Sequence, residues 1–239
     1  MASVASLLSR TALFGAVAEA DRLAVARQML KLDLEPHQTL FTRGDAGSHV
    51  YLVAEGKVRL SVFSADGRLL SFKHAGPGDV FGEIAALDGG PRSADAVALN
   101  RVCVMALTAE RLNQLVESNP RVARAAIACV CQRLRETSAQ AETIALHSVE
   151  TRLARYLLAR VTPPSVAAAG HPGVRCSPAN TRASLDLNIS QSELASLIGA
   201  SRQKTNAALG LLQEAGAISR RGRALVCNAE RLAELASAE

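Results

Sequence analysis

Hydrophobic and polar residues alternate with a period of two between about residue 38 and residue 107. The pattern is clearest in residues 57–62, where each polar residue is followed by an apolar one, as is typical of a half-buried strand. Asp66-Gly67 is a hairpin signal between this strand and residues 69–72, and glycine-containing turns separate further short strands. Many short strands at even spacing predict an antiparallel β-barrel or sandwich.

The pattern becomes helical after about residue 110, where Ala and Leu are frequent. Thr108 is placed to cap a short helix, and Asn119-Pro120 starts a second helix that no Gly or Pro interrupts as far as about His147. A stripe in this second helix steps by four, three, four and three residues, with one polar Thr among apolar members: Val130, Leu134, Thr137, Ala141 and Ile144. Such a narrow heptad stripe predicts two helices packed side by side, and therefore a homodimer through helix 120–147. The alternative is a helix that lies on its own barrel.

The last third of the chain begins with a further predicted helix over residues 148–161, which Pro163-Pro164 ends. Residues 163–183 are rich in Pro, Gly, Ala and Ser and predict a surface loop. The alternating residues 185–189 predict a strand that leads into the final module.

Two capped helices separated by a short turn follow this segment. Ser190 and Glu193 form a capping box at the start of the first helix, and Gly199 ends that helix in a left-handed conformation. Ser201 caps the second helix, which Gly216 ends. The spacing fits a helix-turn-helix unit whose second helix enters the DNA major groove.

Polar and basic side chains of this module are candidates for DNA contact. Arg202, Gln203 and Asn206 lie in the exposed start of the second helix and are residue types that pair with guanine and adenine edges. Residues 218–226 predict a basic hairpin, or wing, able to lie on phosphates. The full set of expected DNA contacts is Ser190, Gln191, Ser201, Arg202, Gln203, Lys204, Asn206, Arg220, Arg221 and Arg223.

Composition and charge agree with a double-stranded DNA partner without requiring one. Of the 239 residues, 49% are hydrophobic, which is enough for the cores of one large domain or two ordinary ones. The net charge is +5, and between Ser201 and Arg223 five basic residues stand against the single acid Glu214. The alternative is that these basic residues form only a solvated face.

No membrane partner or metal is expected. The apolar stretch at the N-terminus is too short and too interrupted to span a membrane. The five cysteines include no C-x-x-C pair, and Cys129 and Cys131 point to different faces of a predicted helix. We therefore expect reduced thiols in a cytoplasmic protein.

A candidate anion site lies between the strands, in residues 78–84 and 91–94. A short helix that opens at Gly82 offers free backbone N–H groups, including those of Ile84 and Ala85, to an anion. Arg92 can clamp a phosphate with two donors, and the Ser93 hydroxyl adds a third. Glu83 is an acceptor suited to a ribose hydroxyl; the alternative is a simple Arg–Glu salt bridge.

These residues resemble the phosphate-binding cassette of cyclic-nucleotide domains, and the chain from about Leu13 to Val226 resembles the Crp/Fnr family of bacterial regulators. The resemblance implies an α+β fold with an N-terminal antiparallel β-barrel (a jelly roll that binds a cyclic nucleotide), a long dimerisation helix and a C-terminal winged helix-turn-helix. The expected boundaries are residues 1–118, 119–147 and 148–239.

The resemblance also implies a ligand and partners. Residues 133–138 match the Thr-Ser pair of the family's cyclic AMP sensors, so Thr137 would meet the adenine amino group and Ser138 would reach the nucleotide of the other subunit. His171-Pro172 weakly resembles a surface that touches RNA polymerase. Gln203 and Ala207 depart from the family, which has an acid and an arginine there, and leave the preferred operator open.

Other effectors and functions remain alternatives. Cyclic GMP would use the same phosphate and ribose contacts, since the Thr137 hydroxyl can donate or accept. An iron–sulfur cluster would need cysteines near the N-terminus, and none precedes Cys103. Haem would need an axial ligand such as His74, but we expect solvated or packed histidines at His37, His49, His74, His147 and His171.

An enzyme and a regulatory module that acts on a partner protein are rival classes. The sequence has no metal-spaced ligands, nucleophile elbow or P-loop, which argues against an enzyme. The predicted helix-turn-helix and wing argue against a module that acts only on another protein.

Overall fold

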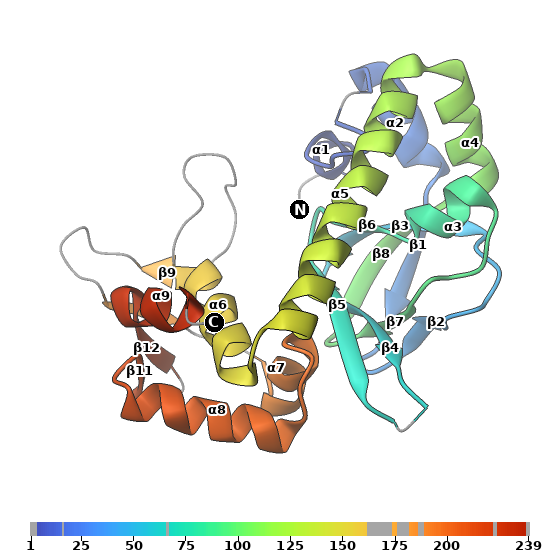
Figure 1. Cartoon of the computed structure of the whole chain (residues 1–239). Coiled ribbons are helices and arrows are strands. Elements are labelled where there is room, and N and C mark those ends of the chain that lie inside the picture. The colour runs from blue at the N-terminus through green and yellow to red at the C-terminus, as the bar shows by residue number, and fades with distance from the viewer. Residues whose placement is uncertain are drawn as a thin grey trace. The chain divides into compact units, whose positions relative to one another are not determined.

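The computed structural model describes residues 4–15, 17–65, 67–161, 174–175, 182–185, 189–221 and 224–237 (Figure 1). The chain divides into two compact units, one of residues 1–64 and 71–138 and the other of residues 65–70 and 139–239.

The first unit consists mainly of short strands, with helices at both ends of the strand region. Its elements, two of which continue into the second unit, are α1 (Val4–Ser9), α2 (Glu19–Gln28), β1 (Leu30–Leu34), β2 (Thr39–Phe41), β3 (His49–Glu55), β4 (Val58–Phe63), β5 (Leu69–Ala75), β6 (Val80–Phe81), α3 (Glu83–Asp88), β7 (Asp95–Ala98), β8 (Val102–Thr108), α4 (Ala109–Ser118) and α5 (Pro120–Leu146). The strands form two four-stranded sheets with the orders β1-β8-β3-β6 and β2-β7-β4-β5. The predicted antiparallel architecture is confirmed, although the two sheets do not close into one barrel.

Strand β3 contributes to two hydrophobic cores because successive side chains point to opposite faces of a sheet. Val50 and Leu52 belong to a core shared with the N-terminal helices, α4 and the start of α5. Tyr51 and Val53 belong to the core that Phe81 and residues of the other sheet complete. A strand buried on both faces reads as a continuous apolar run, which explains why β3 does not alternate in sequence.

Helices α4 and α5 begin where the sequence predicts. The Thr108 side chain accepts a hydrogen bond from the backbone N–H of Arg111 and caps α4. Pro120 is the first residue of α5, where its missing N–H removes no helical hydrogen bond. Only Val122 and Ala126 of the 27 residues of α5 are buried, so most of this helix is not covered by the chain's own described residues.

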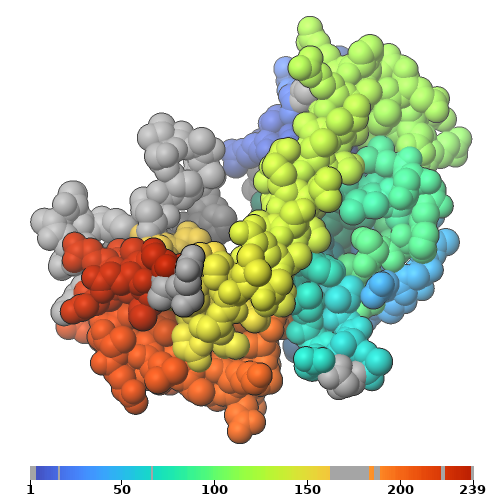
Figure 2. Space-filling model, in the orientation of Figure 1, coloured from blue at the N-terminus to red at the C-terminus, as the bar shows by residue number. Residues whose placement is uncertain are grey.

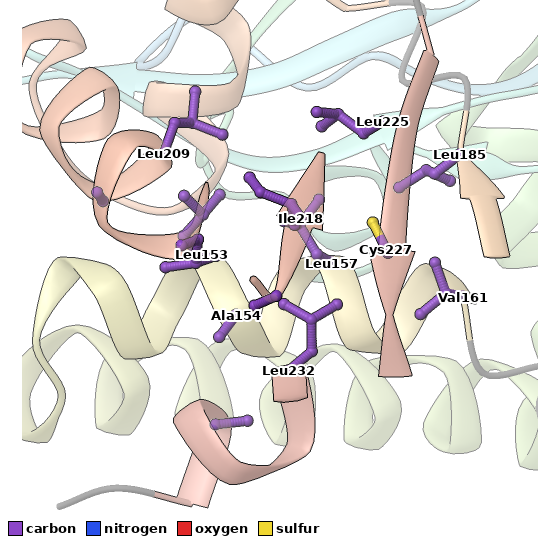
Figure 3. Packing of buried hydrophobic residues seen from close by; sticks show 14 of the residues in the cluster. Leu153, Ala154, Leu157, Val161, Leu185, Leu209, Ile218, Leu225, Cys227 and Leu232 are labelled. Atoms are coloured by element: carbon purple, nitrogen blue, oxygen red, sulfur yellow. The ribbon is translucent and has the colours of Figure 1, made fainter. Parts of the chain in front are cut away.

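The second unit is built around helix α6 (Figure 1). Its elements are α6 (Val149–Val161), β9 (Val174–Arg175), β10 (Arg182–Leu185), α7 (Gln191–Leu197), α8 (Arg202–Glu214), β11 (Ile218–Arg221), β12 (Ala224–Asn228) and α9 (Ala229–Ser237). The strands form one sheet in the order β11-β12-β10-β9. Leu153 and Leu157 of α6 lie one helical turn apart and pack with Ile218, Cys227 and Leu232 in one core (Figure 3).

Part of the segment predicted as loop and strand differs from expectation. Within residues 163–183, predicted as a surface loop, the structure contains β9 and the start of β10. Of the strand predicted over residues 185–189, Leu185 lies in β10, which pairs with β12 from Arg182 to Leu185, and residues 186–188 lie outside the described residues. Helices α2 and α9 and strand β1 were not predicted. Asp66, His171 and Arg223 lie outside the described residues.

Candidate functional site

Gly82 forms the entrance to helix α3 in the first unit. Its φ of 77° is left-handed, and a Cβ at this position would lie 2.8 Å from Nη1 of Arg92. Both facts require glycine. The helix begins at the next residue, and its first backbone N–H groups have no acceptor within the helix. A neighbouring loop approaches closely, since a Cβ on Gly47 would lie 2.2 Å from that of Ala85.

Arg92 is a buried cation beside this helix start. Arg92 is 3% exposed, and its guanidinium forms no ion pair with an Asp or Glu of the described residues. Nη1 donates to the carbonyl oxygen of Gly82 at 3.0 Å, and Nη2 donates to that of His49 at 2.8 Å. Burial lowers the pKa of the guanidinium, against the raising effects of Tyr51 and nearby acids. A buried charge that forms no ion pair is costly, so the site favours an anion.

Glu83 is also buried, but it has a partner that the sequence did not predict. Its Oε1 accepts a hydrogen bond from Nε of Arg133 at 3.0 Å, and their side chains are 4% and 20% exposed. Arg133 also donates from Nη2 to the carbonyl oxygen of Val80 at 3.1 Å. Burial lowers the pKa of Arg133, but Glu83, with smaller contributions from Glu136 and Cys129, raises it, and the pKa is raised overall. The pair joins the start of α3 to the middle of α5.

The structure brings only some of the predicted ligand residues together. Gly82, Glu83 and Arg92 are adjacent, and Ile84 and Ala85 form the first turn of α3. Ser93 is exposed next to Arg92 in the chain. Thr137 and Ser138 are exposed on α5, and Thr137 lies one helical turn beyond Arg133, on the same face. The roles of all these residues toward a ligand stay predictions.

The predicted heptad stripe of α5 is exposed in the single chain. Ile127 and Leu134 are each 66% exposed and Val130 is 39% exposed. Ile127 continues the stripe by one step of three residues toward the N-terminus. Figure 2 shows the part of α5 in the first unit along the near face, with no other described segment over it. Large apolar side chains in a row on a helix are typical of a surface that a partner covers.

The helix-turn-helix prediction is confirmed in the second unit. The Ser190 hydroxyl accepts from the N–H of Glu193 at 3.1 Å, and the Glu193 carboxylate accepts from the N–H of Ser190 at 3.0 Å. Gly199 has a φ of 65° in the turn. The Ser201 hydroxyl accepts from the N–H of Lys204 at 3.2 Å and caps α8. The caps and the turn of the two helices therefore lie at the predicted residues.

The predicted base-reading side chains face solvent. Arg202, Gln203, Lys204 and Asn206 are exposed in the first two turns of α8, whereas the intervening Thr205 is fully buried. Strands β11 and β12 form the predicted wing, whose Arg220 and Arg221 are exposed. A helix start and a hairpin that both expose basic groups suit the major groove and the phosphate backbone, respectively. These contacts with DNA stay predictions.

One arginine joins the end of α5 to the turn of the helix-turn-helix. Nε and Nη2 of Arg152 donate to the carbonyl oxygens of His147 and Ile144, at 2.9 and 2.8 Å. Nη1 donates to those of Gly199 and Ile198, at 3.1 and 3.4 Å. The last carbonyls of a helix lack helical partners and favour a cation. Arg152 therefore satisfies the ends of two helices at once.

Sequence reasoning missed Arg133, Arg152 and the aromatic neighbours of Arg92. Glu83 lies 50 residues from Arg133 and Gly199 lies 47 residues from Arg152, and no local pattern marks such contacts. In the described part of the chain, no group of three or more His, Cys, Asp or Glu is placed to hold a metal ion. A search of the described helices finds none that is both long and apolar enough to cross a membrane.

Comparison with known proteins yields two domain families. The model of the cyclic nucleotide-binding domain matches residues 31–119, and that of the Crp-like helix-turn-helix domain matches residues 151–235. A relative in Mycobacterium tuberculosis, named a CRP-like cAMP-activated global transcriptional regulator, is 28% identical over 96% of this chain and 98% of its own.

Solved structures agree with the fold. FixK2 of Bradyrhizobium japonicum has a TM-score of 0.69 at 24% identity, over 88% of this chain and 98% of its own. The regulator CLP of Xanthomonas campestris, described as responsive to c-di-GMP, has a TM-score of 0.66 at 25% identity, over 84% of this chain and 94% of its own.

Proposed function

Since this chain belongs to the Crp/Fnr family of bacterial transcription regulators, which are not enzymes, and contains a cyclic nucleotide-binding domain and a DNA-binding domain, we propose that it is a homodimer controlled by cyclic AMP. One observation carries the ligand proposal. Arg92 is a guanidinium buried without a carboxylate partner, beside a helix start that offers free N–H groups. A cyclic phosphate supplies the missing negative charge and can accept from both groups.

Three further features support a cyclic nucleotide, and the last of them favours cyclic AMP. The Glu83 carboxylate, held by Arg133, is an acceptor for the ribose hydroxyl. Thr137, one turn further along α5, offers its hydroxyl to the adenine amino group. The Mycobacterium tuberculosis relative is named for its activation by cyclic AMP.

A second candidate effector is c-di-GMP, because CLP is described as responsive to it. Cyclic GMP is a third, because it shares the phosphate and ribose of cyclic AMP.

The exposed stripe of α5 supports the homodimer. Ile127, Leu134 and their neighbours repeat at heptad spacing, so a second copy of the helix would cover them in a coiled coil. In such a dimer Ser138 would contact the nucleotide of the opposite subunit. A ligand between the β-strands and α5 would then favour one arrangement of the two helices and of the DNA modules that follow them.

DNA binding would use the exposed starts of the two α8 helices and the two wings. Arg202, Gln203 and Asn206 would read base edges, while Arg220 and Arg221 would contact phosphates. Contact with RNA polymerase is part of the same proposal, although His171 lies outside the described residues.

The test combines calorimetry with a DNA mobility shift. Wild-type protein is titrated with cyclic AMP, cyclic GMP and c-di-GMP, and each mixture is then assayed on a random DNA pool. We expect the tightest binding and the largest gain in DNA affinity with cyclic AMP. Arg92→Ala should weaken cyclic AMP binding by about 2 kcal/mol or more, the order of a lost charge-assisted pair.

The matched control is Arg101→Ala, since Arg101 is an exposed arginine of the same unit whose ion pair is with the exposed Glu35. It should leave affinity unchanged. Equal binding of cyclic AMP by wild type and Arg92→Ala would contradict the assigned site. If DNA affinity rose only with c-di-GMP, the effector would be c-di-GMP rather than cyclic AMP.

A further inference from the structure

The guanidinium of Arg92 lies against aromatic rings as well as carbonyl oxygens. Its Cζ lies 4.3 Å from the centroid of the Phe41 ring and 5.5 Å from that of Tyr51. Nη1 and Nη2 donate hydrogen bonds to the carbonyl oxygens of Gly82 and His49. The hydrogen bonds and the ring contacts together fix the orientation of the guanidinium plane. Nε is buried and has no hydrogen-bond partner among the described residues.

The rings that contact Arg92 belong to a stacked cluster. The centroids of Phe41 and Tyr51 are 5.8 Å apart with 29° between the planes. Behind them, Phe81 lies 5.4 Å from Tyr51 and 6.1 Å from Phe41. These separations are within the range of favourable aromatic pairs, and Phe81 is fully buried. The cluster is therefore anchored in the core between the sheets.

The aromatic rings stabilise the buried charge of Arg92, which its hydrogen bonds do not neutralise. Two neutral carbonyls do not neutralise a buried guanidinium, and burial lowers its pKa. Aromatic faces carry negative potential, and their attraction for a cation is greatest where water is excluded. The rings thus hold the charge in place in the free protein, with Nε–H left as a donor.

We propose that Phe41 and Tyr51 are positioning residues for the anion-binding Arg92, which they hold flat and in place before the ligand arrives. This proposal rests on the proposed function for its ligand, but not for its geometry. A preorganised side chain loses less conformational freedom on binding, so the rings raise affinity without touching the nucleotide.

The test compares ring removal with ring replacement. Phe41→Leu and Tyr51→Leu should each weaken cyclic AMP binding about tenfold, within the range of a desolvated cation–π contact. Phe41→Tyr keeps a ring and should stay within about twofold of wild type. Phe14→Leu is the matched control, because Phe14 is a buried phenylalanine of the same unit in the other core. It should leave affinity unchanged.

A spectroscopic readout makes the test independent of the ligand. In the free protein, the Arg92 Nε–H resonance, identified by its loss in Arg92→Lys, should be protected from exchange and shifted by the rings. Phe41→Leu should abolish both effects, whereas Phe14→Leu should preserve them.

Two results would overturn the proposal: an Nε–H signal that is unchanged in Phe41→Leu, or equal losses of affinity in Phe41→Leu and Phe14→Leu. If the wild type binds no cyclic nucleotide while the Nε–H signal still depends on Phe41, the positioning role stands and the proposed ligand fails.

Discussion

Replacement of Arg133 by methionine tests the link between helix α5 and the cassette at Glu83. Arg133→Met keeps an unbranched apolar stem but removes the charge and leaves the Glu83 carboxylate, 4% exposed, without its ion pair. Loss of one partner from a buried ion pair costs about 3–5 kcal/mol. Because the Arg133 side chain is 20% exposed, water can partly solvate the carboxylate, and we expect about 3 kcal/mol.

The double variant separates the pair from the packing around it. Arg133→Met combined with Glu83→Leu removes both charges, and apolar replacements of both partners are often neutral or stabilising. We therefore expect the double variant to be more stable than Arg133→Met alone. Arg101→Met is the control for an exposed pair, since Arg101 and Glu35 are 80% and 68% exposed. It should leave the stability nearly unchanged.

Urea unfolding followed by tyrosine fluorescence measures these differences. The chain has two tyrosines and no tryptophan, so a Tyr156→Phe background leaves Tyr51 to report on the first unit alone. The measurements use nucleotide-free protein at one protomer concentration, because ligand and dimer formation both shift apparent stability. A cost below about 1 kcal/mol for Arg133→Met, or a double variant as unstable as the single one, would refute the reasoning.

Three further predictions concern DNA, the dimer and pH. Arg202→Ala should cost about 1–3 kcal/mol of DNA-binding free energy and relax the preference at one base pair per half-site. Arg221→Ala should weaken binding to all sequences alike and reduce the salt dependence of binding by about one ion per subunit. Sequence selection and salt titrations distinguish the two effects. Heterodimers of Arg92→Ala with Ser138→Ala chains should contain one intact and one doubly damaged pocket, and a titration that finds two equally damaged pockets would reject the contribution of Ser138 across the dimer. Burial raises the pKa of the Cys227 thiol to about 11 from its ordinary 9.0, so its contribution to stability is complete below pH 9 and lost as pH rises through 11. The difference in unfolding free energy between wild type and Cys227→Val should therefore be constant up to about pH 9 and change above it; a flat difference across that range would contradict the buried thiol.

The parts of the fold that the sequence predicted depend on local signals. The capping box at Ser190 and Glu193 and the left-handed Gly199 each involve residues within a few positions of one another, so the helix-turn-helix could be placed closely. The start of β10 was not predicted, because this strand pairs with β12, about 40 residues further along the chain, and no local signal in residues 163–183 marks that pairing.

The candidate site was predicted by residue type rather than by surroundings. Gly82 and Arg92 are recognisable because the backbone N–H groups at a helix start and a guanidinium both donate hydrogen bonds to anions. The contacts that hold them are long-range in sequence: Phe41 precedes Arg92 by about 50 residues, and Arg133 follows Glu83 by 50. Such pairs depend on how the sheets and α5 come together, which periodicity does not specify.

The joint made by Arg152 has a consequence for how this protein can diverge. All four of its acceptors are main-chain oxygens, so the side chains that border the joint can change without removal of a bond. The exception is Gly199, where a Cβ would lie 3.0 Å from Ile144. The exposed side chains of α8 can therefore be altered by evolution, or exchanged in a chimera, while the connection to α5 is inherited unchanged as long as Arg152 and Gly199 are kept.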